Sequence, residues 1–235
     1  MKKQEKFEST LDNPPGQIVG IPISGTTLEG DLNIPKNARG IVLFAHGSGS
    51  SRLSPRNQRV AKSLQQSGLA TLLIDLLTSQ EESIDSVTGE LRFNVEFLAH
   101  RLVGATDWLL QYPATRNLPI GYFGASTGAA AALMAAVERP KTAAIVSRGG
   151  RADLAASALT QVKAPTLLII GGDDLPVIEL NWEAFTQLQC EKRLEIVSGA
   201  SHLFEEPGTL DEVARLARNW FETWLDPSLR TLEAA

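Results

Sequence analysis

A serine lies between two glycines in a segment whose neighbours favour a sharp turn. Residues 124–128 read Gly-Ala-Ser-Thr-Gly, with Ser126 at the centre. An apolar run at 118–123 precedes them and an alanine-rich stretch at 129–137 follows, which predicts a strand, a turn and a helix. Such a turn lifts a serine hydroxyl off a sheet, and the flanking glycines let strand and helix pack closely. The segment therefore predicts a nucleophilic serine; the alternative is a plain turn with a solvated serine.

A histidine in a loop could activate that serine as its general base. His202 follows the last predicted strand and precedes the last predicted helix, so its loop could carry the imidazole over the end of a sheet. Of the two other histidines, His100 falls within an amphipathic helical pattern and His46 opens a glycine-rich segment. We therefore expect His202 to be the base.

A carboxylate must orient the imidazole, and two adjacent aspartates are candidates. Asp173 and Asp174 follow the apolar run at 166–170 through a pair of glycines. A carboxylate at this point can fix the imidazole tautomer and stabilise the imidazolium. The spacing from Gly171 favours Asp174, with Asp173 as the alternative. Asp75 also ends a predicted strand, and we expect it to anchor a loop.

Backbone N–H groups would stabilise the oxyanion of an acyl-transfer reaction. Residues 47–50, Gly-Ser-Gly-Ser, follow the strand predicted at 40–45, the usual position of one donor. We expect Ser48 or Gly49 to supply this donor and Thr127, directly after the serine, to supply the other. The segment lacks the Lys-Ser/Thr ending of a phosphate-binding loop and the full dinucleotide fingerprint, so nucleotide binding is not expected.

Short apolar runs alternate with longer helical patterns, which predicts an α/β fold. Strands are expected at 18–23, 28–34, 40–45, 70–74, 120–123, 143–146, 166–170 and 193–197, and helices at 57–66, 94–110, 127–138, 180–188 and 210–224. The first two strands have no helix between them and should form an antiparallel hairpin, whereas the others should be parallel with right-handed crossovers.

Two connections bear on function. Residues 76–91 are polar and acidic, and they predict either a solvated loop or a segment that overhangs a cleft. Residues 147–163 leave space for one small helix and for no large cap domain.

The composition is that of an ordinary globular protein. The 235 residues are 43% apolar and 21% charged with a net charge of −5, and they contain no long basic run, so no nucleic acid partner is expected. Cys190 is the only cysteine, which excludes an intrachain disulfide.

No signal peptide or membrane-spanning stretch is recognisable, so we expect a cytoplasmic protein that binds no membrane. A single domain is predicted over 17–225, with flexible tails at 1–16 and 226–235.

These segments together resemble the α/β-hydrolase superfamily, and within it the dienelactone-hydrolase-like proteins. The likeness spans about residues 28–224 and rests on the motifs at 46–50, 124–128, 171–174 and 199–202. Segments 54–57, 75–78 and 147–151 resemble a subgroup that occurs alone or fused behind a phosphoribosyltransferase domain. The resemblance implies an α/β-hydrolase fold, in which helices flank a mostly parallel eight-stranded sheet without a large cap. The candidate triad has the order Ser, Asp, His of that fold.

One departure from the family bears on the substrate. Dienelactone hydrolases have a cysteine nucleophile, whereas this chain has Ser126 and its Cys190 lies far along the sequence. The chain is therefore expected to be a serine carboxylesterase acting on small esters, without a metal or organic cofactor. The alternatives are another acyl-transfer enzyme (a thioesterase, dienelactone hydrolase, peptidase or acyltransferase) and a catalytically silent ligand-binding relative.

Four arginines fall on loops predicted at the catalytic end. Arg52 and Arg56 follow the first glycine-rich segment, and Arg148 and Arg151 follow the strand at 143–146. A guanidinium could bind a substrate carboxylate through two parallel hydrogen bonds. The favoured alternative is that these arginines pair with acids such as Asp75, Glu81 or Glu82 and fix the long loop.

Overall fold

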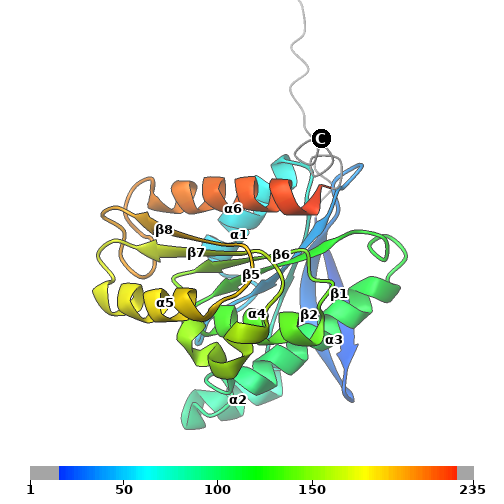
Figure 1. The fold of residues 1–235 in the computed structure, drawn as a ribbon. Helices are drawn as coiled ribbons and strands as arrows, with labels where there is room; N and C mark the ends of the chain where they lie inside the picture. The colour runs from blue at the N-terminus through cyan, green and yellow to red at the C-terminus, as the bar shows by residue number, and fades with distance from the viewer. Residues whose placement is uncertain (1–15, 227–235) are drawn as a thin grey trace, which may run out of the picture.

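The computed structural model describes residues 16–226 of the chain, and an eight-stranded sheet forms its centre (Figure 1). The strand order is β1-β2-β4-β3-β5-β6-β7-β8; β1 and β2 form an antiparallel hairpin, β2 is antiparallel to β4, and all other pairs are parallel. The strands are β1 (Gln17–Ile23), β2 (Thr26–Asn33), β3 (Ile41–Ala45), β4 (Ala70–Ile74), β5 (Ile120–Ala125), β6 (Ala144–Arg148), β7 (Thr166–Gly171) and β8 (Lys192–Val197). The predicted fold class, including the hairpin, is confirmed.

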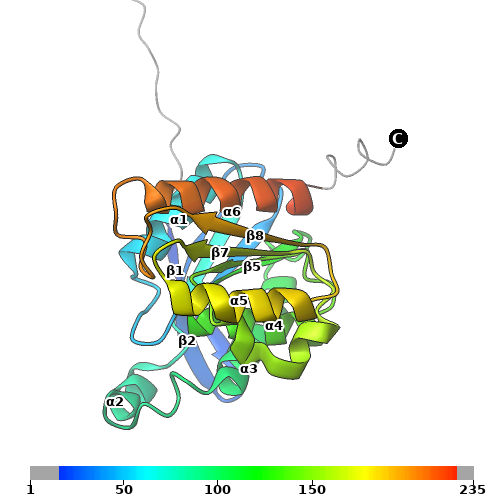
Figure 2. The same cartoon turned by 60° about the vertical axis from the view of Figure 1, so that its left-hand side comes forward.

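Helices cover both faces of the sheet (Figure 1). One face packs against α1 (Pro55–Gln66) and α6 (Thr209–Leu225). The other packs against α3 (Val95–Gln111), α4 (Thr127–Glu138), the 3₁₀ helix η1 (Ala152–Gln161) and α5 (Leu175–Gln187). A further helix, α2 (Ser79–Thr88), projects away from this second layer (Figure 2).

The apolar runs of the central strands follow from this double cover, because both faces of each strand are buried. Alternate residues of β3 point to opposite layers: Leu43 joins the core beneath α3 and α4, and Phe44 joins the core beneath α1 and α6. Tyr122 and Phe123 divide in the same way on β5. The small side chains of α4 let this helix approach the sheet, and nine of its residues are buried.

Two helices differ from the sequence prediction. The connection expected at 76–91 contains α2, which begins with a capping box between Thr78 and Glu81 and ends at Gly89. The Thr-x-x-Glu spacing is a sequence signal for this helix, but its weak apolar pattern concealed it. Helix α5 begins at Leu175, five residues before the expected start at 180, because Pro176 is compatible with a first helical turn. Residues 1–15 and 227–235 of the predicted tails lie outside the described residues.

Candidate functional site

Ser126 occupies a strained turn between β5 and α4. Its backbone angles are φ 49° and ψ −123°, a region that residues with a side chain rarely adopt. A methyl group at Gly124 would lie 2.4 Å from the Cα atom of Ala129, and one at Gly128 would lie 2.4 Å from the carbonyl oxygen of Ala45. Only glycine fits at either position, so the two glycines permit the close strand-to-helix turn that holds Ser126.

His202 and Asp174 meet at the carboxyl end of the sheet. His202 lies in the loop between β8 and α6, and Asp174 lies at the start of α5, directly after β7. The imidazole Nδ1 and carboxylate Oδ2 are 2.6 Å apart, and the Asp174 side chain is only 13% exposed. The carboxylate accepts a hydrogen bond, so Nδ1 carries the proton and Nε2 is left to receive one. The exposed neighbour Asp173 uses its main-chain N–H to bind Ala200 O at 3.0 Å.

Residues 148–151 connect the serine turn to the histidine loop. The carbonyl of Arg148 accepts a hydrogen bond from Ser126 N–H at 3.4 Å, and Arg151 N–H donates to Ser126 O at 3.1 Å. Gly149 contacts the other loop, since a methyl group there would lie 3.0 Å from the carbonyl oxygen of His202. The serine turn and the histidine loop therefore converge on one short segment at the end of β6.

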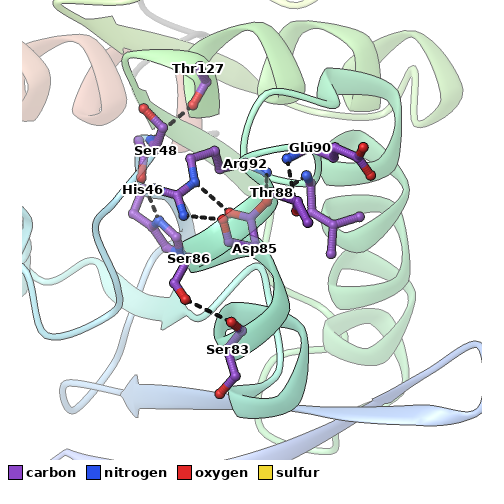
Figure 3. A network of polar contacts seen from close by, with 11 residues as sticks. His46, Ser48, Ser83, Asp85, Ser86, Thr88, Glu90, Arg92 and Thr127 are labelled. Carbon is purple, nitrogen blue, oxygen red and sulfur yellow. Dashed lines mark hydrogen bonds and ion pairs between the residues drawn. The ribbon is translucent and has the colours of Figure 1, made fainter.

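The expected oxyanion donors also lie beside Ser126. A methyl group at Gly47 would lie 2.9 Å from the Cβ atom of Ser126, so the loop after β3 passes directly over the turn. Within this loop the N–H of Ser48 donates to Thr127 Oγ1 at 3.1 Å (Figure 3). Thr127 N–H is at the first position of α4, where no intrahelical acceptor exists. No partner of Gly49 N–H occurs within residues 16–226.

His46 stabilises the loop after β3, a role that the sequence did not reveal. Its Nε2 accepts a hydrogen bond from Leu76 N–H at 3.1 Å, so Nδ1 carries the proton and donates to Gly47 O at 2.9 Å. Burial lowers the pKa of His46 despite the opposing hydrogen bond to Gly47, so the imidazole is neutral. It joins the loop after β3 to the chain leaving β4.

Three of the four predicted arginines pair with acids. Arg52 binds Glu29, Asp31 and Asp75, which is the loop-anchoring alternative for this residue. Arg151 pairs with Asp153 at 2.8 Å, and Arg56 pairs with Glu205 at 3.2 Å. Only Arg148 forms no ion pair with any carboxylate of the described chain.

Ionic contacts hold the segment containing α2 together and join it to α3. Asp85 is fully buried and accepts hydrogen bonds from Leu91 N–H at 2.6 Å and Arg92 Nε at 2.5 Å (Figure 3). Burial alone would raise the pKa of Asp85, but these hydrogen bonds outweigh it and lower the pKa. A second ion pair joins Glu81 to Arg101 on α3. Arg92 and Ser48 line the same small cavity, so this segment borders the loop after β3.

The only cysteine lies away from this site. Cys190 is half-buried before β8, and its sulfur lies 3.7 Å from the hydroxyl of Thr166 at the opposite, amino end of β7. Burial raises the pKa of the thiol, which disfavours the reactive thiolate. Among residues 16–226 there is neither a helix long and apolar enough to cross a membrane nor a group of three metal-binding side chains.

The sheet topology and the strained serine turn define an α/β hydrolase fold. The sequence model of the dienelactone hydrolase family matches residues 28–226, so the chain belongs to this family. The crystal structure of a dienelactone hydrolase from Anabaena variabilis is 63% identical, with a TM-score of 0.89 over 91% of this chain and 99% of that chain. An esterase of Pyrococcus furiosus is 18% identical, with a TM-score of 0.72 over 89% and 91% of the two chains, and shares the fold.

A curated relative of Mycobacterium tuberculosis has a different kind of name. It is called a putative phosphoribosyl transferase and is 53% identical over 206 residues, which are 87% of this chain. The match covers 45% of that protein, so the chain spans less than half of the relative's length.

Proposed function

We propose that the protein hydrolyses small carboxylic esters through an acyl-enzyme intermediate on Ser126. The observation that carries this proposal is the His202–Asp174 pair at 2.6 Å, in a loop that contacts the same segment as the serine turn. The strained angles at Ser126 support it, because strain of this kind concentrates at functional residues. Family membership supports hydrolytic chemistry in general.

The mechanism follows from the roles that each group can take. His202 Nε2 removes the proton of the Ser126 hydroxyl, and Asp174 stabilises the resulting imidazolium. The serine oxygen attacks the ester carbonyl. The N–H of Thr127 stabilises the oxyanion together with that of Gly49, or with that of Ser48 once it leaves Thr127 Oγ1. The alcohol leaves with the proton from His202. Water activated by the same imidazole then releases the acid, and none of these steps needs a metal or organic cofactor.

The surroundings of the site favour small substrates. The connection between β6 and β7 holds only η1, so within the described residues no large cap domain covers the catalytic edge. An open site offers little apolar surface to a long acyl chain, and we therefore propose short-chain esters as substrates.

The test is a substrate panel on wild type and Ser126→Ala. Esters of p-nitrophenol with short and long acyl chains, thioesters and peptides separate esterase activity from the other acyl-transfer activities. Ser126→Ala should lower ester turnover by around a millionfold, the effect known for a serine that acts with its base. Ser198→Ala, which changes an exposed serine in the histidine loop, is the matched control and should keep its activity.

A fluorophosphonate probe distinguishes the esterase from a silent binding protein. Wild type and Ser198→Ala should become labelled, whereas Ser126→Ala should not. Labelling without hydrolysis of any ester would indicate a different acyl substrate. A wild type that neither reacts with the probe nor hydrolyses the panel would refute the proposal.

A further inference from the structure

Within residues 16–226, Arg148 is a buried cation without an anionic partner. It is the last residue of β6 and only 6% exposed. Its Nη2 donates to Asn57 Oδ1 at 3.1 Å, and its Nε is buried without any hydrogen-bond acceptor in the described chain. Leaving a buried charged donor unpaired is unfavourable, so such a group is a strong candidate for binding an external anion.

A second guanidinium lies nearby. Arg56 is in the first turn of α1, where the helix dipole adds positive charge. In the described part of the chain its Nε is also buried without an acceptor. Its Nη1 pairs there only with Glu205, whose side chain is 63% exposed. Burial and the charge of Arg56 lower the pKa of Arg148 to about 10, so Arg148 remains charged at neutral pH. Among the described residues, the exposed Glu205 is the one carboxylate that pairs with either arginine.

This positive cluster adjoins the candidate triad. The carbonyl of Arg148 accepts the hydrogen bond from Ser126 N–H at 3.4 Å. Its guanidinium carbon lies 5.9 Å from the ring centre of Phe204, two residues after His202 in the same loop. Arg56 reaches Glu205, the next residue of that loop. The two guanidinium groups therefore lie between α1 and the histidine loop, at the edge of the sheet that carries Ser126.

We propose that Arg148 and Arg56 form a subsite for an anionic group of the substrate, a carboxylate or a phosphate. The subsite rests on the ester hydrolysis proposed above and assigns its substrate class: short esters with an oxyanionic group on the acyl part. Each guanidinium can offer parallel N–H groups to two oxygens, a geometry that suits both anions. Glu205 turns toward solvent when the anion binds Arg56. The paired Arg52 and Arg151 take no part.

Matched esters test the subsite. Mono-p-nitrophenyl succinate carries a free carboxylate, the p-nitrophenyl ester of phosphoglycolate carries a phosphate, and p-nitrophenyl butyrate is the neutral reference. The readout is the ratio of kcat/KM for each anionic ester to that for the neutral ester. Arg148→Gln and Arg56→Gln should each lower this ratio at least tenfold for one anion or both. The anionic ester whose ratio falls more carries the preferred anion.

Two further variants make the result specific. Arg148→Lys keeps the charge but not the planar fork, so its ratio should fall less than that of Arg148→Gln. Arg59→Gln removes an exposed arginine of the same helix that pairs with Asp211, and its ratio should equal that of wild type. If Arg148 only supports the histidine loop, both kinds of ester lose activity equally and the ratio is unchanged, which overturns the proposal.

Direct binding separates failure of the subsite from failure of the esterase. Calorimetric titration of Ser126→Ala with succinate and with inorganic phosphate requires no turnover. Binding that is lost in Ser126→Ala/Arg148→Gln supports the subsite even when wild type hydrolyses no ester. Absence of binding of either anion, together with normal hydrolysis of the neutral ester, overturns the subsite and leaves the proposed esterase intact.

Discussion

The carboxylate of Asp174 lies 2.6 Å from Nδ1 of His202, although 28 positions separate the two residues in the chain. Asp174→Asn replaces the acceptor with an amide, which can donate to Nδ1 and impose the wrong tautomer. We expect kcat for ester hydrolysis to fall by about 10⁴-fold, as in other triads with this change. Steady-state kinetics with a short p-nitrophenyl ester measures the effect.

Asp173→Asn is the control, because the Asp173 side chain is exposed and adjacent in sequence. It should leave kcat nearly unchanged. Equal losses in the two variants would mean that the turn as a whole, rather than the carboxylate of Asp174, supports activity.

The contact between Ser48 N–H and Thr127 Oγ1 leads to a second prediction. This bond of 3.1 Å connects the two segments that are expected to supply the oxyanion donors. Thr127→Val keeps the shape of the side chain but removes the oxygen, so the loop after β3 is held less firmly. We expect kcat to fall about tenfold with little change in KM, a smaller loss than the 10²–10³-fold that follows removal of a donor.

Thr127→Ser retains the hydroxyl and should keep most of the activity. A rise of kcat in Thr127→Val would contradict this account, because it would mean that the hydroxyl competes with the substrate for Ser48 N–H.

Local patterns in the sequence were sufficient for the sheet and for the serine turn. The turn at Ser126 requires glycines within two residues on either side, and each strand requires its own apolar run. Such requirements involve neighbours in the chain, so they can be read from the sequence. The capping box at Thr78 and Glu81 was an equally local signal for α2. The prediction of a polar connection at 76–91 did not use this signal and therefore missed the helix.

Contacts between loops that are distant in the chain could not be predicted from the sequence. Arg148 meets Asn57 across 91 positions, and Ser48 meets Thr127 across 79. The partner of each group depends on where separate crossovers bring their loops, which no local pattern encodes. For the same reason the four arginines looked equivalent in the sequence, although within residues 16–226 Arg52 has three acidic partners and Arg148 has none.

The neutral, buried His46 should make stability depend on pH. Its pKa in the folded state lies below the ordinary value of 6.5 that it regains on unfolding. Between these two values the unfolded chain binds a proton that the folded chain does not, so the free energy of unfolding falls as the pH decreases below 6.5. The contribution of the neutral His46 to the free energy of unfolding is fully present above pH 6.5. Chemical denaturation between pH 7.5 and 5 in steps measures it.

His46→Gln keeps an acceptor for Leu76 N–H and removes the titrating group. Its free energy of unfolding should be lower than that of wild type at neutral pH and should change less as the pH falls. His100→Gln, which alters an exposed histidine bonded to Ser24, should retain the pH dependence of wild type. If the free energy of unfolding of His46→Gln changes with pH as steeply as that of wild type, His46 does not cause the pH dependence.

The buried Asp85 should control how firmly the α2 segment is held. It accepts hydrogen bonds from Leu91 N–H and from the main chain and side chain of Arg92, and Asp85→Asn removes the charge that these donors share. Arg92 is the only lysine or arginine within 63–100, so trypsin can cut this stretch only there. We expect Asp85→Asn to accelerate cleavage after Arg92 by about tenfold, because the segment opens locally more often. Glu90→Gln changes an exposed acid of the same segment and should leave the rate unaltered. Equal cleavage rates in wild type and Asp85→Asn would show that contacts other than the carboxylate hold the segment in place.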